Sequence, residues 1–126
     1  MGKFKFSGPA KRLRIYIGEQ AKYKGISLYH ALVLKAKEMD MAGITVIKGI
    51  EGFGANVRIQ TSRLVELSSD LPIIVEVVDS TDYIDNYILA IEHLIEDGLV
   101  TIDDVEIIKY SSYLGGRLKR LQRENE

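Results

Sequence analysis

The stretch Leu71-Pro-Ile-Ile-Val-Glu-Val-Val78 is nearly all apolar. Such a run, bounded by polar residues, is typical of a strand buried inside a sheet. Pro72 stands at its start, where a missing backbone N–H is tolerated. The stretch therefore predicts a central strand, around which the rest of the chain can be arranged.

Helices are predicted on both sides of this strand. Upstream, between the candidate N-cap Ser27 and the terminating Gly43, apolar residues recur at helical spacing: Leu28, Leu32, Ala36 and Met39. Downstream, helix-start residues at 79–82 precede a second such series, which Gly98 ends: Ile84, Ile88, Ile91 and Ile95. Each helix therefore links two strands.

The other strand patterns complete the order of elements. Leu13–Gly18 alternates, Ile44–Ile50 is apolar, and Leu99–Ile102 and Val105–Tyr110 form the last extended part. A weaker alternation predicts an edge-like strand near Arg58–Leu64. The order β-α-β-β-α-β is that of the ferredoxin-like plan, an α+β fold with two helices on one face of an antiparallel sheet. The second face carries too many apolar residues to stand bare, so burial in an oligomer is expected.

The composition favours a single domain in the cytoplasm. The chain has 126 residues, 46% of them apolar, and no cysteine, which excludes disulfides and thiolate metal sites. No apolar run approaches the roughly 20 residues that span a bilayer. The basic start is not followed by the apolar region of a secretory signal. Net charge is +6 over residues 1–24, −9 over 25–110 and +2 over 111–126; basic ends either steer anions or keep the protein soluble.

A glycine-rich stretch, Lys48-Gly49-Ile50-Glu51-Gly52-Phe53-Gly54-Ala55, follows the second predicted strand. It is not a Walker A loop, because no Gly-Lys-Ser/Thr follows, and its spacing does not fit the dinucleotide fingerprint. Two interpretations stay open. The glycines either provide a structural bend or let the backbone approach a ligand.

Several spaced stretches carry a resemblance to a known family: Leu13-Arg-Ile-Tyr-Ile-Gly-Glu19, Tyr23-Lys-Gly-Ile-Ser-Leu-Tyr-His-Ala31, Ala42-Gly-Ile-Thr-Val-Ile-Lys-Gly-Ile-Glu-Gly-Phe-Gly-Ala55 and Leu71-Pro-Ile-Ile-Val-Glu-Val-Val-Asp79. Together they resemble the PII-like signalling superfamily, and more narrowly its uncharacterised archaeal and bacterial family labelled a domain of unknown function. The resemblance covers residues 13–110. It leaves a basic N-terminal extension, 1–12, and a basic C-terminal tail, 111–126.

The resemblance implies a homotrimer whose sheets pack together, with an adenine nucleotide (AMP, ADP or ATP) in the clefts between neighbouring subunits. Gly52-Phe53-Gly54 matches the turn that opens a mobile loop in PII proteins. It also implies no required cofactor and a protein partner that reads this loop, for which a membrane transporter is a candidate. One departure concerns the PII phosphate loop. The corresponding stretch, Glu96-Asp97-Gly98-Leu99-Val100-Thr101, is acidic and has no Lys or Arg.

The candidate nucleotide-binding residues come from three places, and each place has a structural alternative. Glycine backbone N–H groups can face an anion, ammonium groups near a helix start can hold phosphate, and an arginine on the presumed loop can fork onto it. The alternatives are a turn, a solvated loop and a surface charge. The complete set is Gly49, Glu51, Gly52, Phe53, Gly54, Arg58, Lys22, Tyr23 and Lys24.

The favoured function is a non-catalytic, nucleotide-binding regulator, with three other classes kept beside it. A small ferredoxin-like enzyme acting on a phosphate compound would use Arg14 or Arg58 with Asn56. A cation-tolerance-type trimer is disfavoured by the lack of Cys and by only two histidines. Nucleic-acid binding lacks stacking aromatics on the predicted sheet. Neither a catalytic set nor a metal site is predicted.

Overall fold

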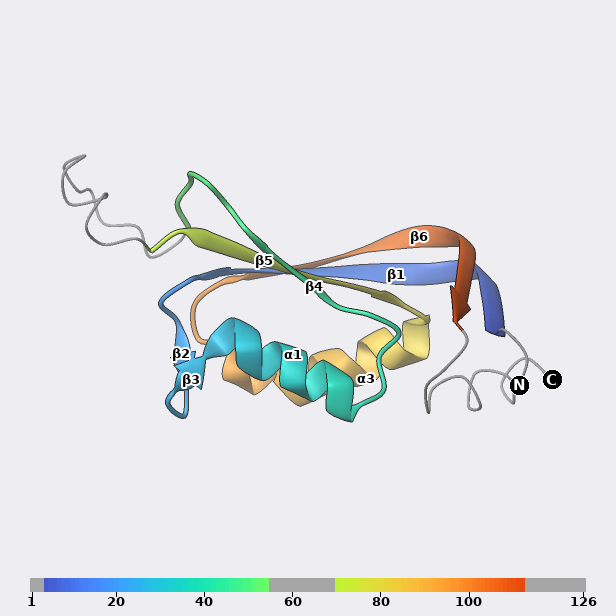
Figure 1. Cartoon of the computed structure of the whole chain (residues 1–126), viewed down its shortest axis with the longest axis horizontal. Helices are drawn as coiled ribbons and strands as arrows, with labels where there is room; N and C mark the ends of the chain where they lie inside the picture. The colour runs from blue at the N-terminus through green and yellow to red at the C-terminus, as the bar shows by residue number, and fades with distance from the viewer. Residues whose placement is uncertain (1–3, 55–69, 113–126) are drawn as a thin grey trace.

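The computed structural model describes residues 4–54 and 70–112 (Figure 1). In chain order, the elements are β1 (Phe4–Gly18), β2 (Lys22–Tyr23), β3 (Ile26–Ser27), α1 (Leu28–Glu38), β4 (Thr45–Lys48), β5 (Pro72–Asp79), α3 (Thr81–Ile91), the short 3₁₀-helix η1 (Glu92–Leu94) and β6 (Leu99–Ser112).

Four strands form one antiparallel sheet in the order β4-β5-β1-β6. Both helices lie on one face of it, and the other face is open among the described residues (Figure 1). This is the predicted ferredoxin-like α+β arrangement. The stretch that begins at Leu71 is confirmed as an inner strand, because β5 pairs with β1 on one side and with β4 on the other.

Several element bounds differ from the sequence prediction. β1 begins at Phe4 rather than Leu13, and β6 is one strand rather than two segments. The additional residues of β1 pair with β6, and the register shifts between Phe6 and Gly8 at a β-bulge. Local pattern does not show this pairing because the partners lie far apart in sequence. The predicted strand Arg58–Leu64 falls outside the described residues.

Three further bounds differ near the chain turns. β4 spans only Thr45–Lys48, although Gly49 N still donates to Pro72 O. Between β1 and α1, where no strand was predicted, the chain forms the small β2–β3 hairpin. The second helix ends at Ile91 and tightens into η1, which leaves Ile95 extended. Helix ends commonly tighten in this way.

The core lies between the sheet and the helices. Its buried residues come from alternate positions of β1 and β5 and from the facing sides of α1 and α3: Leu13, Ile15, Ile17, Leu28, Leu32, Ala36, Ile73, Val75, Val77, Ile84, Tyr87 and Ile91. The Tyr87 hydroxyl donates to Leu32 O at 2.7 Å and so joins the two helices. Burial raises the pKa of Tyr87 above its ordinary value, because the charged form would lose its hydration.

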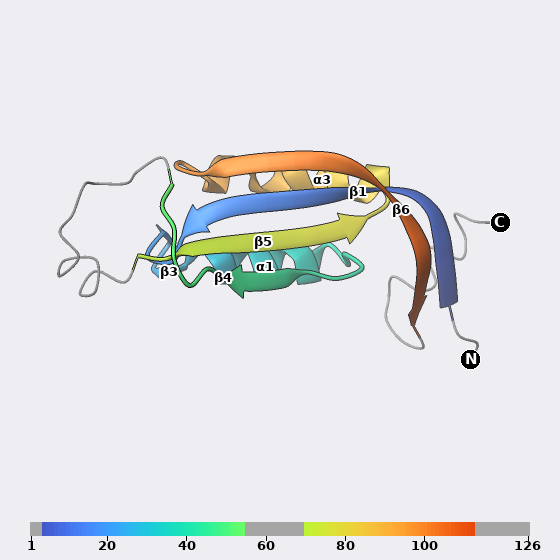
Figure 2. The ribbon, with the colours of Figure 1, turned by 90° about the horizontal axis from the view of Figure 1, so that it is seen from above.

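Figure 2 looks onto the open face, across which the four strands lie side by side. The strand register places the side chains of this face in rows that cross all four strands. One row is apolar or aromatic and consists of Ile47, Ile74, Tyr16 and Leu99. The neighbouring row is polar and consists of Thr45, Glu76, Arg14 and Thr101. In the single chain the ends of the apolar row are about half exposed, at 46% for Ile47 and 56% for Leu99. This face is therefore apolar in one band and charged in the next.

Candidate functional site

The glycine-rich stretch packs against the start of β5. Gly49 N donates to Pro72 O at 2.7 Å. A Cβ at Gly49 would lie 2.8 Å from Pro72 Cγ, and one at Gly52, whose φ is +153°, would lie 3.1 Å from the same atom. A Cβ at Gly54 would meet nothing within 4 Å among residues 4–54 and 70–112. Packing therefore accounts for the first two glycines, and the described residues place no such requirement on Gly54.

The apolar side chains of this stretch point into solvent. Phe53 is 79% exposed and Ile50 is 95% exposed. Glu51 is exposed as well. An aromatic residue in such a stretch can either fill the core or cover a ligand. Its exposure excludes the first role within the single chain, so its ring is free to stack on a planar group.

Residues 19–20, which follow β1, contact both the end of β4 and the residues just before β5. Glu19 N donates to Leu71 O at 2.9 Å, and Gln20 N donates to Asp70 Oδ1 at 3.0 Å. On the other side, Lys48 Nζ forms an ion pair with Glu19 Oε2 at 2.9 Å. Residues 18–20, 48–49 and 70–72 thus meet at one end of the sheet.

Glu19 and Lys48 were missed by the sequence analysis. Each is a single charged residue at the end of a predicted strand, and nothing local in the sequence pairs them. The signal that was available is topological. In the predicted fold the strands Leu13–Gly18 and Ile44–Ile50 end at the same edge of the sheet, so charges just beyond them are brought together.

The candidates Lys22, Tyr23 and Lys24 form a separate group in the β2–β3 hairpin. Lys24 Nζ lies 5.3 Å from the centroid of the Tyr23 ring, which meets His93 edge-on at 6.4 Å between centroids. The hairpin lies on the helix side of the sheet, whereas residues 49–54 rise on the open side (Figure 1). One subunit therefore does not bring the two predicted groups together. Arg58 lies outside the described residues.

The acidic segment at 96–101 enters β6 beside the end of β1. A Cβ at Gly98 would lie only 2.7 Å from Tyr16 O and 3.1 Å from Ile17 Cγ2. Leu99 then pairs with Tyr16. Gly98 is thus required by close backbone packing. The segment contributes no cation that could hold a phosphate.

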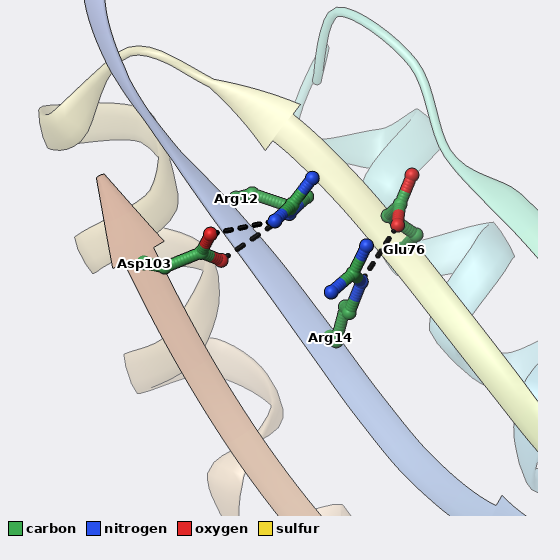
Figure 3. A network of polar contacts seen from close by, with 4 residues as sticks. All are labelled: Arg12, Arg14, Glu76 and Asp103. Carbon is green, nitrogen blue, oxygen red and sulfur yellow. Dashed lines mark hydrogen bonds and ion pairs between the residues drawn. The ribbon is translucent and has the colours of Figure 1, made fainter. Parts of the chain in front are cut away.

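A hollow of about 700 Å³ lies at the opposite end, beneath the part of the β1–β6 ribbon that extends past β5. Its charged lining is largely paired. Arg12 holds Asp103 through Nε at 3.2 Å and Nη2 at 2.7 Å, and Glu76 accepts from Arg14 Nε at 2.8 Å (Figure 3). The hydrogen bond to Glu76 raises the pKa of Arg14.

Within residues 4–54 and 70–112, no group of three or more His, Cys, Asp or Glu side chains is placed to hold a metal ion. No helix in that part of the chain is long and apolar enough to cross a membrane.

Sequence comparisons with known proteins match this chain to one family. The sequence profile of the DUF190 family, described as "Uncharacterized ACR", matches residues 10–107. A "UPF0166 protein" of Aquifex aeolicus is 36% identical over 98 residues, which cover 78% of this chain and 92% of the relative. A second one, from Methanocaldococcus jannaschii, is 32% identical over 105 residues, which cover 82% of this chain and 96% of the relative.

Solved structures show the fold. CPII from Thiomonas intermedia, a nitrogen regulatory PII-like protein bound to ADP, AMP and bicarbonate, superposes with a TM-score of 0.59 at 15% identity, over 81% of this chain and 91% of CPII. A protein from Thermus thermophilus described as PII-like and signalling gives 0.56 at 13% identity, over 81% and 92%. The chain therefore has a PII-like fold, as its sequence motifs predict.

Proposed function

We propose that this chain, which belongs to the DUF190 family of uncharacterised proteins, is a non-catalytic PII-like regulator that binds an adenine nucleotide at its glycine-rich end. The observation that carries the proposal is Gly52-Phe53-Gly54, an exposed aromatic ring between two glycines at the end of β4. A protein of the same fold, CPII, holds ADP and AMP. Backbone N–H groups beside glycine can bind phosphate oxygens, and an exposed ring can stack on a base.

The remaining candidates fit a cleft between subunits better than a site within one. Residues 49–54, which hold the glycine-stretch candidates, stand on the open side of the sheet, and the β2–β3 hairpin, which holds the candidates Lys22, Tyr23 and Lys24, lies on the helix side (Figure 1). A ligand between two copies can meet the first group of one subunit and the second group of its neighbour. Arg58 is assigned to the same site by its place after the glycines.

A homotrimer is proposed as the assembled state, with its sheets packed through the open face. The row of Ile47, Ile74, Tyr16 and Leu99 gives that face an apolar band to bury. These four residues are direct neighbours across the strands of the sheet, so their side chains form one continuous band. Sedimentation equilibrium is expected to give three times the mass of the chain, and Ile47→Glu is expected to shift it to monomer. A wild-type monomer would contradict the assembly.

The signalling step is proposed to take place in the cytoplasm through residues 49–54 and the residues that follow them. Nucleotide occupancy there would be read by a protein partner, for which a membrane transporter is a candidate. The partner's identity is approached by affinity capture with and without AMP. Capture that does not depend on AMP would argue against this role.

The binding test is calorimetric titration with AMP, ADP and ATP, with GMP as the base control. Micromolar binding of at least one adenine nucleotide is expected, and no binding at millimolar concentration would overturn the function. Phe53→Ala is expected to weaken binding about tenfold, within the range of base stacking on an aromatic ring. Ile50→Ala is the matched control, because Ile50 is also apolar and exposed.

A further inference from the structure

The ion pair between Glu19 and Lys48 has an unusual feature. Glu19 Oε2 accepts from Lys48 Nζ at 2.9 Å, but its second oxygen, Oε1, is buried and has no hydrogen-bond partner among the described residues. The side chain as a whole is 23% exposed, and that of Lys48 is 53% exposed. One oxygen of the carboxylate is therefore paired, and the other is covered without a hydrogen-bond donor among the described residues.

Burial without a donor is costly for a carboxylate oxygen. An unsatisfied buried polar atom loses its hydration without compensation, and the loss is larger for a charged group. Glu19 is also fixed from its backbone, since Glu19 N donates to Leu71 O. This bond fixes the backbone of Glu19, whereas its side chain is partly exposed and can turn. A ligand donor would reach Oε1, which is covered in the single chain, once the carboxylate turns toward it.

The surroundings limit what this donor can be. A carboxylate repels a phosphate, so Glu19 is suited to a neutral hydroxyl or amino group. Lys48 is suited to an anion instead, because its half-exposed ammonium group can contact an anion while it stays near Glu19. Gly49 follows Lys48 directly, so the cation stands at the base of the glycine stretch. The pair therefore offers one acceptor and one cation next to each other.

We infer that Glu19 and Lys48 are ligand-binding residues of the nucleotide site, an assignment that rests on the proposed function. Glu19 Oε1 accepts a hydrogen bond from a hydroxyl or amino group of the nucleoside part. Lys48 contacts the phosphate and supplies the cation that the acidic segment at 96–101 lacks. The site thus recognises a nucleoside monophosphate or diphosphate by two adjacent and opposite charges.

AMP titration of three proteins tests this: the wild type, Glu19→Gln and Lys48→Met. Lys48→Met is expected to weaken AMP binding about tenfold and to reduce the dependence of affinity on NaCl concentration, because one charge contact is lost. Glu19→Gln is expected to weaken AMP binding about fivefold, as a charge-assisted hydrogen bond becomes neutral. Removal of a negative charge near an anionic ligand would by itself strengthen binding, so the direction is diagnostic.

The control pair is Lys11 and Asp104, which form a similar contact at 3.2 Å away from the glycine end. Lys11→Met and Asp104→Asn are expected to leave AMP affinity within about twofold of wild type, because exposed pairs act weakly at a distance. If Lys48→Met fails to fold, Lys48→Arg keeps the charge, and affinity within about fivefold of wild type is expected. AMP affinity that is unchanged in Lys48→Met, or unchanged or raised in Glu19→Gln, overturns the assignment. A wild-type protein that binds no nucleotide defeats the proposed function instead.

Discussion

The two ends of the sheet are built in different ways. At the glycine end, backbone atoms approach so closely that a Cβ at Gly49 or Gly98 would collide with Pro72 or Tyr16. At the far end, the ribbon of β1 and β6 is joined by partly exposed ion pairs such as Lys11–Asp104 and Arg12–Asp103. Close backbone contact tolerates no added atom, whereas exposed charges are screened by water. The glycine end should therefore be the less tolerant of substitution.

The largest effect is expected for Gly98→Ala. Its new Cβ would lie 2.7 Å from Tyr16 O, a backbone atom that cannot move without disturbing β1. The free energy of unfolding should fall by about 2 kcal/mol, as for an overpacked interior position. Urea denaturation at fixed protein concentration measures it. Gly54→Ala is the control, since its Cβ would meet nothing within 4 Å in the described part of the chain; equal stabilities of the two variants would break the comparison.

Gly49→Ala is expected to cost less, about 1 kcal/mol, because the nearest atom is a proline ring carbon at 2.8 Å that can shift slightly. Its penalty should shrink in the double variant Gly49→Ala/Pro72→Ala, which lacks that ring carbon. A double-mutant cycle in urea measures this coupling. If the two changes simply add, the contact with Pro72 is not the reason for the glycine.

Tyr110→Phe tests how the ribbon is anchored at the far end. The Tyr110 hydroxyl donates to Ala42 O at 3.1 Å and so joins β6 to the connection between α1 and β4. Loss of one partly buried neutral hydrogen bond should lower the free energy of unfolding by about 0.7 kcal/mol. The measurement is again urea denaturation. A loss as large as that of Gly98→Ala would show that the two ends are equally demanding.

The smallest effect is expected for Lys11→Met. Lys11 contacts Asp104, which is 89% exposed, so the pair should contribute less than about 0.5 kcal/mol. The difference from the wild type should shrink further in about 1 M NaCl, where the Debye length is about 3 Å. Thermal denaturation at low and high salt checks it. A salt-independent loss above about 1 kcal/mol would mean that packing of the lysine stem, not its charge, matters.

The sequence was sufficient where the hydrophobic pattern is local. The apolar run at β5 and the helical spacing of Leu28, Leu32, Ile84 and Ile91 predicted the inner strand and the helical layer. These residues prove to be buried, because the same periodicity that forms an element also turns one side of it toward the core. The strand pattern likewise placed the glycine stretch directly after a strand, and the family resemblance added the prediction that it binds a ligand.

The features that the sequence did not predict depend on contacts between residues that are distant in the chain. The beginning of β1 contains Gly8 and Pro9, which argue against a strand, and it extends only because β6 lies beside it. The pair of Glu19 and Lys48 is set by where two strands end. The reason for Gly49 is likewise a residue from another strand, Pro72. Single-sequence patterns carry no information about such contacts.

The ribbon that continues past β5 has a consequence for the behaviour of the protein in concentrated solution. From Phe4 to Ala10, β1 pairs only with β6 in the described part of the chain, so one side of it presents a strand edge. Edges of this kind recruit strands from other molecules and start aggregation. Pro9 offers no N–H to an incoming strand, and the bulge beside Gly8 interrupts a flat register. Gly8 and Pro9, which argue against a strand in the sequence, are therefore also the residues that oppose aggregation at this edge.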